Sequence, residues 1–182
     1  MPGWLNVPNL LTLLRLGLTP LVIQAILEGR HLLALAIFAA AAFTDYLDGA
    51  TARRFKIATP SGAYLDPIAD KCLLSGVFLA LAGAHLVPRW LVGIIIGRDV
   101  YILLGVATVM LLTSIRRFPP SIWGKISTFV QIVTAAVWMA RDAFPCPPLN
   151  FLSFLSLWPC AGCTLWSGLH YTWRGVQMAR AH

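Results

Sequence analysis

Charged residues are scarce in this 182-residue sequence, at 12%, whereas hydrophobic residues make up 58%. A soluble globular domain carries charge on roughly a quarter of its residues. So few charges cannot cover a water-exposed surface, and we therefore expect lipid to surround much of the chain. Acids are rarer still, with seven against fourteen Lys and Arg residues, so the position of each acid is informative.

Cysteine and histidine, with four residues each, are too sparse and scattered to predict a zinc site. Cys160 and Cys163 form a C-x2-C pair, but no second pair or histidine lies at ligand spacing. We expect the cysteines to be small packing residues, and a disulfide involving Cys146, Cys160 or Cys163 stays open. The sequence also lacks an internal repeat and a cleavage site after its first apolar run, so we expect that run to remain in the membrane.

Long apolar runs, by contrast, are abundant. A membrane-spanning helix needs about 20 mostly apolar residues, and proline, glycine and charge clusters separate one run from the next. We therefore predict an all-α fold: a polytopic membrane protein whose six transmembrane helices form one bundle and one domain over residues 1–182. The predicted spans are 10–27, 32–50, 62–86, 90–113, 122–140 and 149–173.

The basic residues set the expected orientation in the membrane. Eight lie in or beside the second and fourth connections or after the last run, and three lie on the opposite side. Because Lys and Arg concentrate in cytoplasmic loops, both termini and these loops are expected to be cytoplasmic (at the inner membrane in a bacterium). The charges are divided among loops, so we expect no nucleic-acid partner.

Four of the seven acids crowd into residues 45–70. Asp45 and Asp48 are three residues apart near the end of the second run, and Asp66 and Asp70 are four apart near the start of the third. Each pair therefore shares a face of its helix. If the two helices are antiparallel, all four carboxylates converge at membrane depth, where charge is costly and usually functional.

Converging carboxylates repel one another unless cations intervene. Lys71 and Arg53 are candidates for neutralising them. Bound metal ions are the favoured alternative, and an all-oxygen ligand set suits Mg²⁺, Mn²⁺ or Ca²⁺ rather than zinc. Two ions about 3.5–4 Å apart are a recurring arrangement for displacement at phosphorus. The small residues Gly49, Ala52 and Gly62 would let a ligand approach closely, and Arg53 could bind phosphate through two hydrogen bonds.

Residues 45–70 read D-x2-D-G-x2-A-R-x8-G-x3-D-x3-D, which resembles the signature of the CDP-alcohol phosphatidyltransferases at every fixed position. The resemblance implies a homodimer of six-helix protomers that uses Mg²⁺ or Mn²⁺, with two ions per protomer. Such enzymes displace CMP from a CDP-linked lipid by an acceptor hydroxyl. The implied metal ligands are Asp45, Asp48, Asp66 and Asp70, with Asp70 also the catalytic base. The implied donor-binding residues are Asp45, Asp48, Gly49, Ala52, Arg53, Gly62 and Asp66.

Residues outside the motif bear on the acceptor. The opening stretch resembles both phosphatidylglycerophosphate synthases and eukaryotic-type cardiolipin synthases, and its polar residues could face a cavity, although Arg15 could instead snorkel to the interface. Residues 97–100 and 120–131 resemble the cardiolipin synthases more, because glycerophosphate-using relatives usually carry Arg-Glu in place of Arg98-Asp99. The candidate acceptor- or phosphate-binding residues are Asn9, Thr12, Arg15, Arg98, Arg116, Lys125 and Gln131.

These features favour CDP-diacylglycerol as the lipid donor and phosphatidylglycerol as the acceptor, giving cardiolipin. A doubly charged glycerol 3-phosphate should need more positive charge than a phosphodiester, and residues 101–113 are uncharged. Synthesis of phosphatidylglycerophosphate from glycerol 3-phosphate is the alternative. An ion or proton-coupled transporter would also use intramembrane aspartates, but the acids cluster beside one loop and no inverted repeat is visible. A binding protein that has lost its chemistry should have lost an aspartate.

Overall fold

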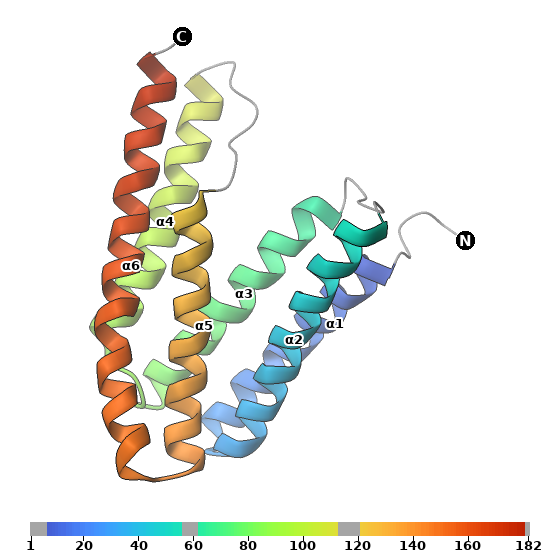
Figure 1. The fold of residues 1–182 in the computed structure, drawn as a ribbon, viewed down its shortest axis with the longest axis vertical. Helices are drawn as coiled ribbons and strands as arrows, with labels where there is room; N and C mark the ends of the chain where they lie inside the picture. The colour runs from blue at the N-terminus through green and yellow to red at the C-terminus, as the bar shows by residue number, and fades with distance from the viewer. Residues whose placement is uncertain (1–6, 56–61, 113–120, 181–182) are drawn as a thin grey trace.

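The computed structural model describes the backbone of residues 7–55, 62–112 and 121–180, and the side chains of residues 12–44, 69–105, 108, 121–175 and 177. All regular structure in these ranges is helical, as predicted (Figure 1). The helices are α1 (Val7–Leu27), α2 (His31–Phe55), α3 (Gly62–Gly83), α4 (Arg89–Leu112), α5 (Ile122–Ala143) and α6 (Pro147–Arg180). Each predicted span therefore falls on one helix.

The helices differ from the predicted spans mainly at their ends. α2 continues beyond residue 50 to Phe55, and α6 extends to Arg180, because a helix can carry its charged end past the apolar segment. α3 stops at Gly83, shortly before His85 turns the chain with a φ of 59°. Pro20 and Pro159 lie inside α1 and α6 rather than at a helix end.

Two described segments are long and apolar enough to cross a membrane, Ile122–Ala143 and Pro147–Gly175. Thr12–Leu27 and His31–Thr44 are shorter apolar helices. The prediction of six helices is thus confirmed, whereas six membrane spans remain a prediction. Large apolar side chains such as Phe151, Phe154 and Trp158 point outward from α6, and an extended exposed apolar surface marks contact with a partner or a membrane.

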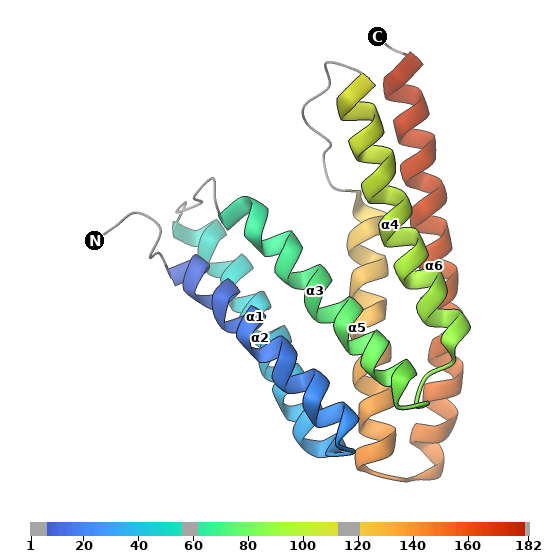
Figure 2. The same cartoon turned by 180° about the vertical axis from the view of Figure 1, so that it is seen from behind.

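The helices form two groups of three that diverge like the arms of a V (Figures 1 and 2). In the first arm α1 packs along α2 and α3, and in the second α6 packs along α4 and α5. The arms meet mainly through α2 and α5, with smaller contacts from α3. The turns at residues 28–30, 84–88 and 144–146 lie toward the closed end of the V, whereas the last turns of α2 and the first turns of α3 lie at its open end.

The first arm is held together by a close approach of α1 and α3. Gly76 lies where a Cβ atom would come within 2.9 Å of Ile23 Cδ1. Small residues allow the backbones of neighbouring helices to approach in this way. Around this point Val22, Val77 and Phe78 are fully buried. The packing fixes α3, which carries Asp70, against the helix that carries Arg15.

Candidate functional site

The motif occupies the last turns of α2 and the first turns of α3. These two helices run antiparallel, and the ends that carry the motif both lie at the open end of the V (Figures 1 and 2). The backbone therefore brings the two pairs of aspartates to the same region. All motif side chains except Asp70 lie outside the described ones, and their roles stay predictions: Asp45, Asp48, Gly49, Ala52, Arg53, Gly62 and Asp66.

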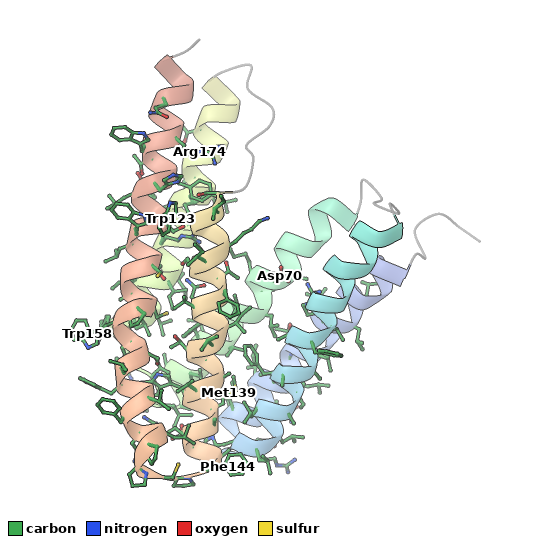
Figure 3. The ribbon with its side chains drawn as sticks, in the orientation of Figure 1. Asp70, Trp123, Met139, Phe144, Trp158 and Arg174 are labelled. Atoms are coloured by element: carbon green, nitrogen blue, oxygen red, sulfur yellow. The ribbon has the colours of Figure 1, made fainter. Side chains whose placement is uncertain are left out.

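Asp70, which Figure 3 labels on α3, forms an ion pair with Arg15 of α1. Arg15 Nη1 on α1 donates to Asp70 Oδ1, and the Arg15 side chain is fully buried whereas that of Asp70 is 37% exposed. A buried guanidinium is stable only when its charge is compensated. A cavity of about 30 Å³ adjoins both residues and has room for a water molecule. Asp70 is thus a carboxylate anchored on one side and accessible on another.

This pair revises the interpretation of the N-terminal stretch. Arg15 does not snorkel, because its side chain is completely enclosed. Thr12 lies one turn earlier on α1 and is also buried. Asn9 is on the same helix, but its side chain lies outside the described residues. Arg15 therefore contacts Asp70 in the structure, and its role in binding an acceptor phosphate stays a prediction.

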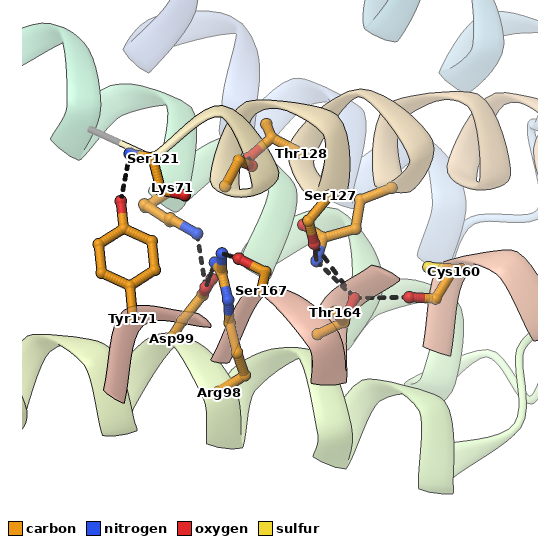
Figure 4. Close-up of polar contacts among 12 residues, drawn as sticks. Lys71, Arg98, Asp99, Ser121, Ser127, Thr128, Cys160, Thr164, Ser167 and Tyr171 are labelled. Atoms are coloured by element: carbon orange, nitrogen blue, oxygen red, sulfur yellow. Dashed lines mark hydrogen bonds and ion pairs between the residues drawn. The ribbon is translucent and has the colours of Figure 1, made fainter. Parts of the chain in front are cut away.

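A second polar cluster lies between α3, α4 and α6 (Figure 4). Lys71 Nζ is 2.5 Å from Asp99 Oδ1, and Arg98 Nη1 is 2.6 Å from the same oxygen. Arg98 Nη2 donates to Ser167 Oγ on α6. We refer to Lys71, Arg98, Asp99 and Ser167 as the Asp99 cluster. A single carboxylate oxygen thus connects α3 to α4 and, through Arg98, to α6.

Two glycines lie beside the buried Arg98 side chain. A Cβ atom on Gly168 would lie 3.5 Å from Arg98 Cγ, and one on Gly124 would lie 3.7 Å from Arg98 Nη2. The Arg98 side chain is 7% exposed, whereas that of Lys71 is 43% exposed. Of the two cations in the Asp99 cluster, Lys71 is consequently the one that an incoming ligand can reach.

The other candidate acceptor residues are not gathered at this cluster. Gln131 is buried between α5 and α6, where its Nε2 donates to Thr164 Oγ1 at 3.1 Å and to Ser127 Oγ at 3.4 Å. Lys125 is exposed near the start of α5. Arg116 lies in 113–120, outside the described residues. Of the candidates whose side chains the structure describes, Arg98 alone belongs to the Asp99 cluster.

The sequence did not predict that Lys71, Asp99 and Ser167 gather around Arg98. Lys71 was considered only as a counter-charge for the motif aspartates, and Asp99 only as part of a family resemblance. The available signal was that Asp99 is the one acid in the fourth apolar run, where an ionised carboxylate requires a cation. Ser167 gives no such signal, because a serine in a helix usually packs without a charged partner.

The described part of the chain holds no cluster of three or more metal-ligating side chains. Three of the four motif aspartates lie outside that part, so the predicted metal site is not tested. Asp70 fits such a site, because its carboxylate has an accessible side and oxygen ligands suit Mg²⁺ and Mn²⁺. All four cysteines are free thiols, so the structure contains no disulfide.

The sequence matches known proteins along most of its length. A family model described as CDP-alcohol phosphatidyltransferase matches residues 5–168. The chain is 40% identical to the "Probable phosphatidylglycerophosphate synthase" of Mycobacterium tuberculosis, over 94% of this chain and 82% of that protein. It is 33% identical to the cardiolipin synthase (CMP-forming) of Rattus norvegicus, over 96% and 64% respectively. The CDP-diacylglycerol–glycerol-3-phosphate 3-phosphatidyltransferase of Bacillus subtilis is 31% identical, over 91% and 93%.

Proposed function

Because this chain belongs to the CDP-alcohol phosphatidyltransferase family of membrane-bound enzymes, we propose that it is a cardiolipin synthase. It transfers the phosphatidyl group of CDP-diacylglycerol to a hydroxyl of phosphatidylglycerol and releases CMP. The names of two relatives point to different acceptors. One relative is named a cardiolipin synthase, and the other a probable phosphatidylglycerophosphate synthase. Neither the family nor these relatives support the transporter alternative.

The observation that carries the choice of acceptor is the shortage of available positive charge among the described side chains beside Asp70. Arg15 is engaged by Asp70, and Arg98 is buried against Asp99 and Ser167. Lys71 is the more exposed cation of the Asp99 cluster. No charged residue follows Asp99 on α4, from residue 100 to 112. This supply of charge suits a phosphodiester with one negative charge better than the dianion of glycerol 3-phosphate.

Asp70 acts as the general base in the proposed reaction. The acceptor hydroxyl oxygen attacks the phosphorus that carries diacylglycerol, and the bond from this phosphorus to the CMP oxygen breaks. The hydroxyl proton passes to the Asp70 carboxylate, and CMP leaves with the electron pair of the broken bond. A base needs a fixed position and access to the proton. The buried Arg15 provides the first, and the partial exposure of Asp70 provides the second.

We further propose that two Mg²⁺ or Mn²⁺ ions serve the donor side of the site. Bound there, they would compensate the negative charge of the donor pyrophosphate and of the departing CMP. The small motif residues and Arg53 would surround the CDP moiety. The proposed metal ligands are Asp45, Asp48, Asp66 and Asp70.

The proposed setting is a membrane bundle of six spans, with the motif and both termini on the cytoplasmic side. Six helices that turn back at the two ends of the molecule are compatible with this topology. The preference of Lys and Arg for cytoplasmic loops supports the orientation. We also propose a single domain over residues 1–182 that works as a homodimer, on the basis of the family resemblance.

Phosphatidylglycerophosphate synthesis is the second candidate function. It is favoured by the name of the Mycobacterium tuberculosis relative, which is 40% identical to this chain. It shares the donor, the proposed metals and the base Asp70. The two candidates differ only in whether the hydroxyl belongs to phosphatidylglycerol or to glycerol 3-phosphate.

A CMP-release assay tests the proposed function. Purified protein is supplied with CDP-diacylglycerol, Mg²⁺ or Mn²⁺ and one acceptor at a time, and the lipid products are identified by mass. We expect cardiolipin from phosphatidylglycerol and little product from glycerol 3-phosphate. The Asp70→Asn variant should release no CMP with either acceptor while it still binds the donor. Phosphatidylglycerophosphate as the sole product would establish the second candidate instead.

A further inference from the structure

We propose that Lys71 binds the phosphate of the acceptor, and that Asp99 limits how much negative charge this phosphate can carry. The inference rests on the proposed function insofar as the acceptor must contain a phosphate. It adds the residues that would distinguish a phosphodiester from a phosphomonoester. In the absence of the acceptor, Asp99 holds the Lys71 ammonium in place.

The two cations of the Asp99 cluster differ in burial and in hydrogen bonding, and we therefore assign them different roles. Lys71 Nζ and Arg98 Nη1 both contact Asp99 Oδ1, at 2.5 and 2.6 Å. Arg98 is buried and also donates to Ser167. Lys71 has a flexible stem, pairs with Asp99 and is much more exposed. Lys71 can therefore turn from the carboxylate to a phosphate, whereas Arg98 remains with Asp99.

The position of Lys71 suits an acceptor that must also reach the base. Lys71 directly follows Asp70 on α3, and adjacent helical residues point about 100° apart. Asp70 accordingly contacts Arg15 of α1, whereas Lys71 contacts Asp99 of α4. In phosphatidylglycerol the free terminal hydroxyl and the phosphodiester are joined by a single glycerol unit. Such a head group can present its hydroxyl to Asp70 and its phosphate to Lys71.

Asp99 then determines how much negative charge of an acceptor phosphate the cluster can balance. Its carboxylate and the two cations together carry a net charge of +1. A phosphodiester balances this charge, whereas a phosphomonoester dianion exceeds it and is repelled by the nearby carboxylate. Repulsion of the wrong ligand is a common source of specificity. Removal of the Asp99 charge should therefore admit the dianion.

The first test is the Asp99→Asn variant, compared with Asp142→Asn as a matched control. Asp142 also pairs with the arginine before it, with Arg141 Nη2 at 2.8 Å, and it lies near the closed end of the V. We expect Asp99→Asn to raise kcat/KM for glycerol 3-phosphate, relative to phosphatidylglycerol, by about tenfold, because one partly buried charge is removed. Asp142→Asn should leave this ratio unchanged. An unchanged ratio in Asp99→Asn, or an equal change in both variants, would overturn the inference.

The second test addresses Lys71. The Lys71→Gln variant should raise KM for the acceptor and leave KM for CDP-diacylglycerol unchanged, and Lys71→Arg should partly restore the acceptor KM. If Lys71 only ties α3 to α4, its loss would lower the unfolding temperature and kcat without moving the acceptor KM. That pattern would contradict the proposed role.

A binding measurement keeps the inference testable in a variant that has no turnover. The unfolding temperature of the purified protein is followed against the concentration of glycerol 3-phosphate, which stabilises the folded state if it binds there. Asp99→Asn should be stabilised at lower concentrations than the wild type, and identical curves would count against a selective role for Asp99. The acceptor that the wild type prefers tests the proposed function separately. Whichever acceptor this is, the comparison of Asp99→Asn with the wild type still tests the role of Asp99.

Discussion

Arg15, Lys71 and Arg98 are three basic residues inside predicted apolar spans, and each contacts an acid in the structure. Charge in an apolar environment is costly unless it is paired. The pairs connect different helices, from α1 to α3 and from α3 to α4. The same contacts that make these charges tolerable therefore also position Asp70 and Lys71.

The contact of Arg15 with the proposed base Asp70 leads to a prediction. The Arg15→Met variant should lower kcat by about 100-fold, because a displaced base loses its alignment with the hydroxyl. Arg15→Lys should recover part of this loss, since it restores the charge but not the geometry of the guanidinium. The measurement is single-turnover CMP release at saturating donor and acceptor.

Arg30→Met provides the control for the Arg15 variants. Arg30 is exposed, pairs with Glu28 at 3.2 Å and lies in the turn between α1 and α2. It should behave as the wild type. If Arg15→Met kept its kcat, Arg15 would have no part in orienting Asp70.

At the scale of residues, the sequence predicted which side chains share a face of one helix. It did not predict contacts between side chains on different helices. The spacing of the four aspartates predicts that they gather, because each pair lies within one helical turn of its own helix. The partner of Arg15 could not be predicted, since Asp70 is 55 residues away and the pairing depends on how α1 packs against α3. The contact of the Gln131 amide with Thr164, 33 residues away on α6, could not be predicted from the sequence either.

At the scale of elements, the approach of α1 and α3 depends on Gly76. Arg15, Thr19 and Ile23 follow one another at intervals of four residues along one face of α1. The side chains of Thr19 and Ile23 lie within 4 Å of the position of a Gly76 Cβ atom. A larger distance between α1 and α3 at Gly76 would therefore also separate Arg15 from Asp70.

The Gly76→Val variant should destabilise the protein by about 1–3 kcal/mol through overpacking. It should also lower kcat, because α1 moves away from α3. Gly93→Val is the matched control on α4, where no atom lies within 4 Å of the added Cβ. Thermal unfolding in detergent and CMP release give the two readouts. A Gly76→Val protein as stable and active as the control would show that the close approach is dispensable.

The elements themselves were largely predictable, because apolar runs bounded by proline and charge have the length of helices. The residues at which the helices end were less predictable. The span predicted to end at residue 50 continues to Phe55 because hydropathy marks the apolar segment and not the last helical hydrogen bond. Pro20 and Pro159 remain within helices, so proline alone did not locate the ends.

At the scale of the whole molecule, the proposed topology can be tested with a natural cysteine. Cys146 lies in the turn before α6, at the closed end of the V, and is half-buried. As the sole cysteine, it should react with a membrane-impermeant maleimide added outside intact cells. Lys125→Cys in a cysteine-free chain, near the start of α5, should react only after permeabilisation. Labelling of Lys125→Cys alone would invert the orientation, and labelling of both from outside would exclude the proposed spans.

The V-shaped arrangement could not be predicted from hydropathy, which gives the number of helices but not their neighbours. α3 and α4 are consecutive and joined by a short turn, yet α3 packs mainly on α1, and α4 on α6. The partner of each helix depends on local features such as Gly76, whose effect appears only when two helices meet.

The turn at 84–88 separates the motif aspartates, all in the first arm, from Asp99 in the second. Exchange of genetic material at this turn would replace one arm without interrupting a helix or dividing the carboxylate set. A lineage would in this way inherit its transfer chemistry intact, with Lys71 still present, while a new second arm supplied a different partner for it. Acceptor preference in such proteins would then change by recombination in a single event, rather than by gradual remodelling of the catalytic residues.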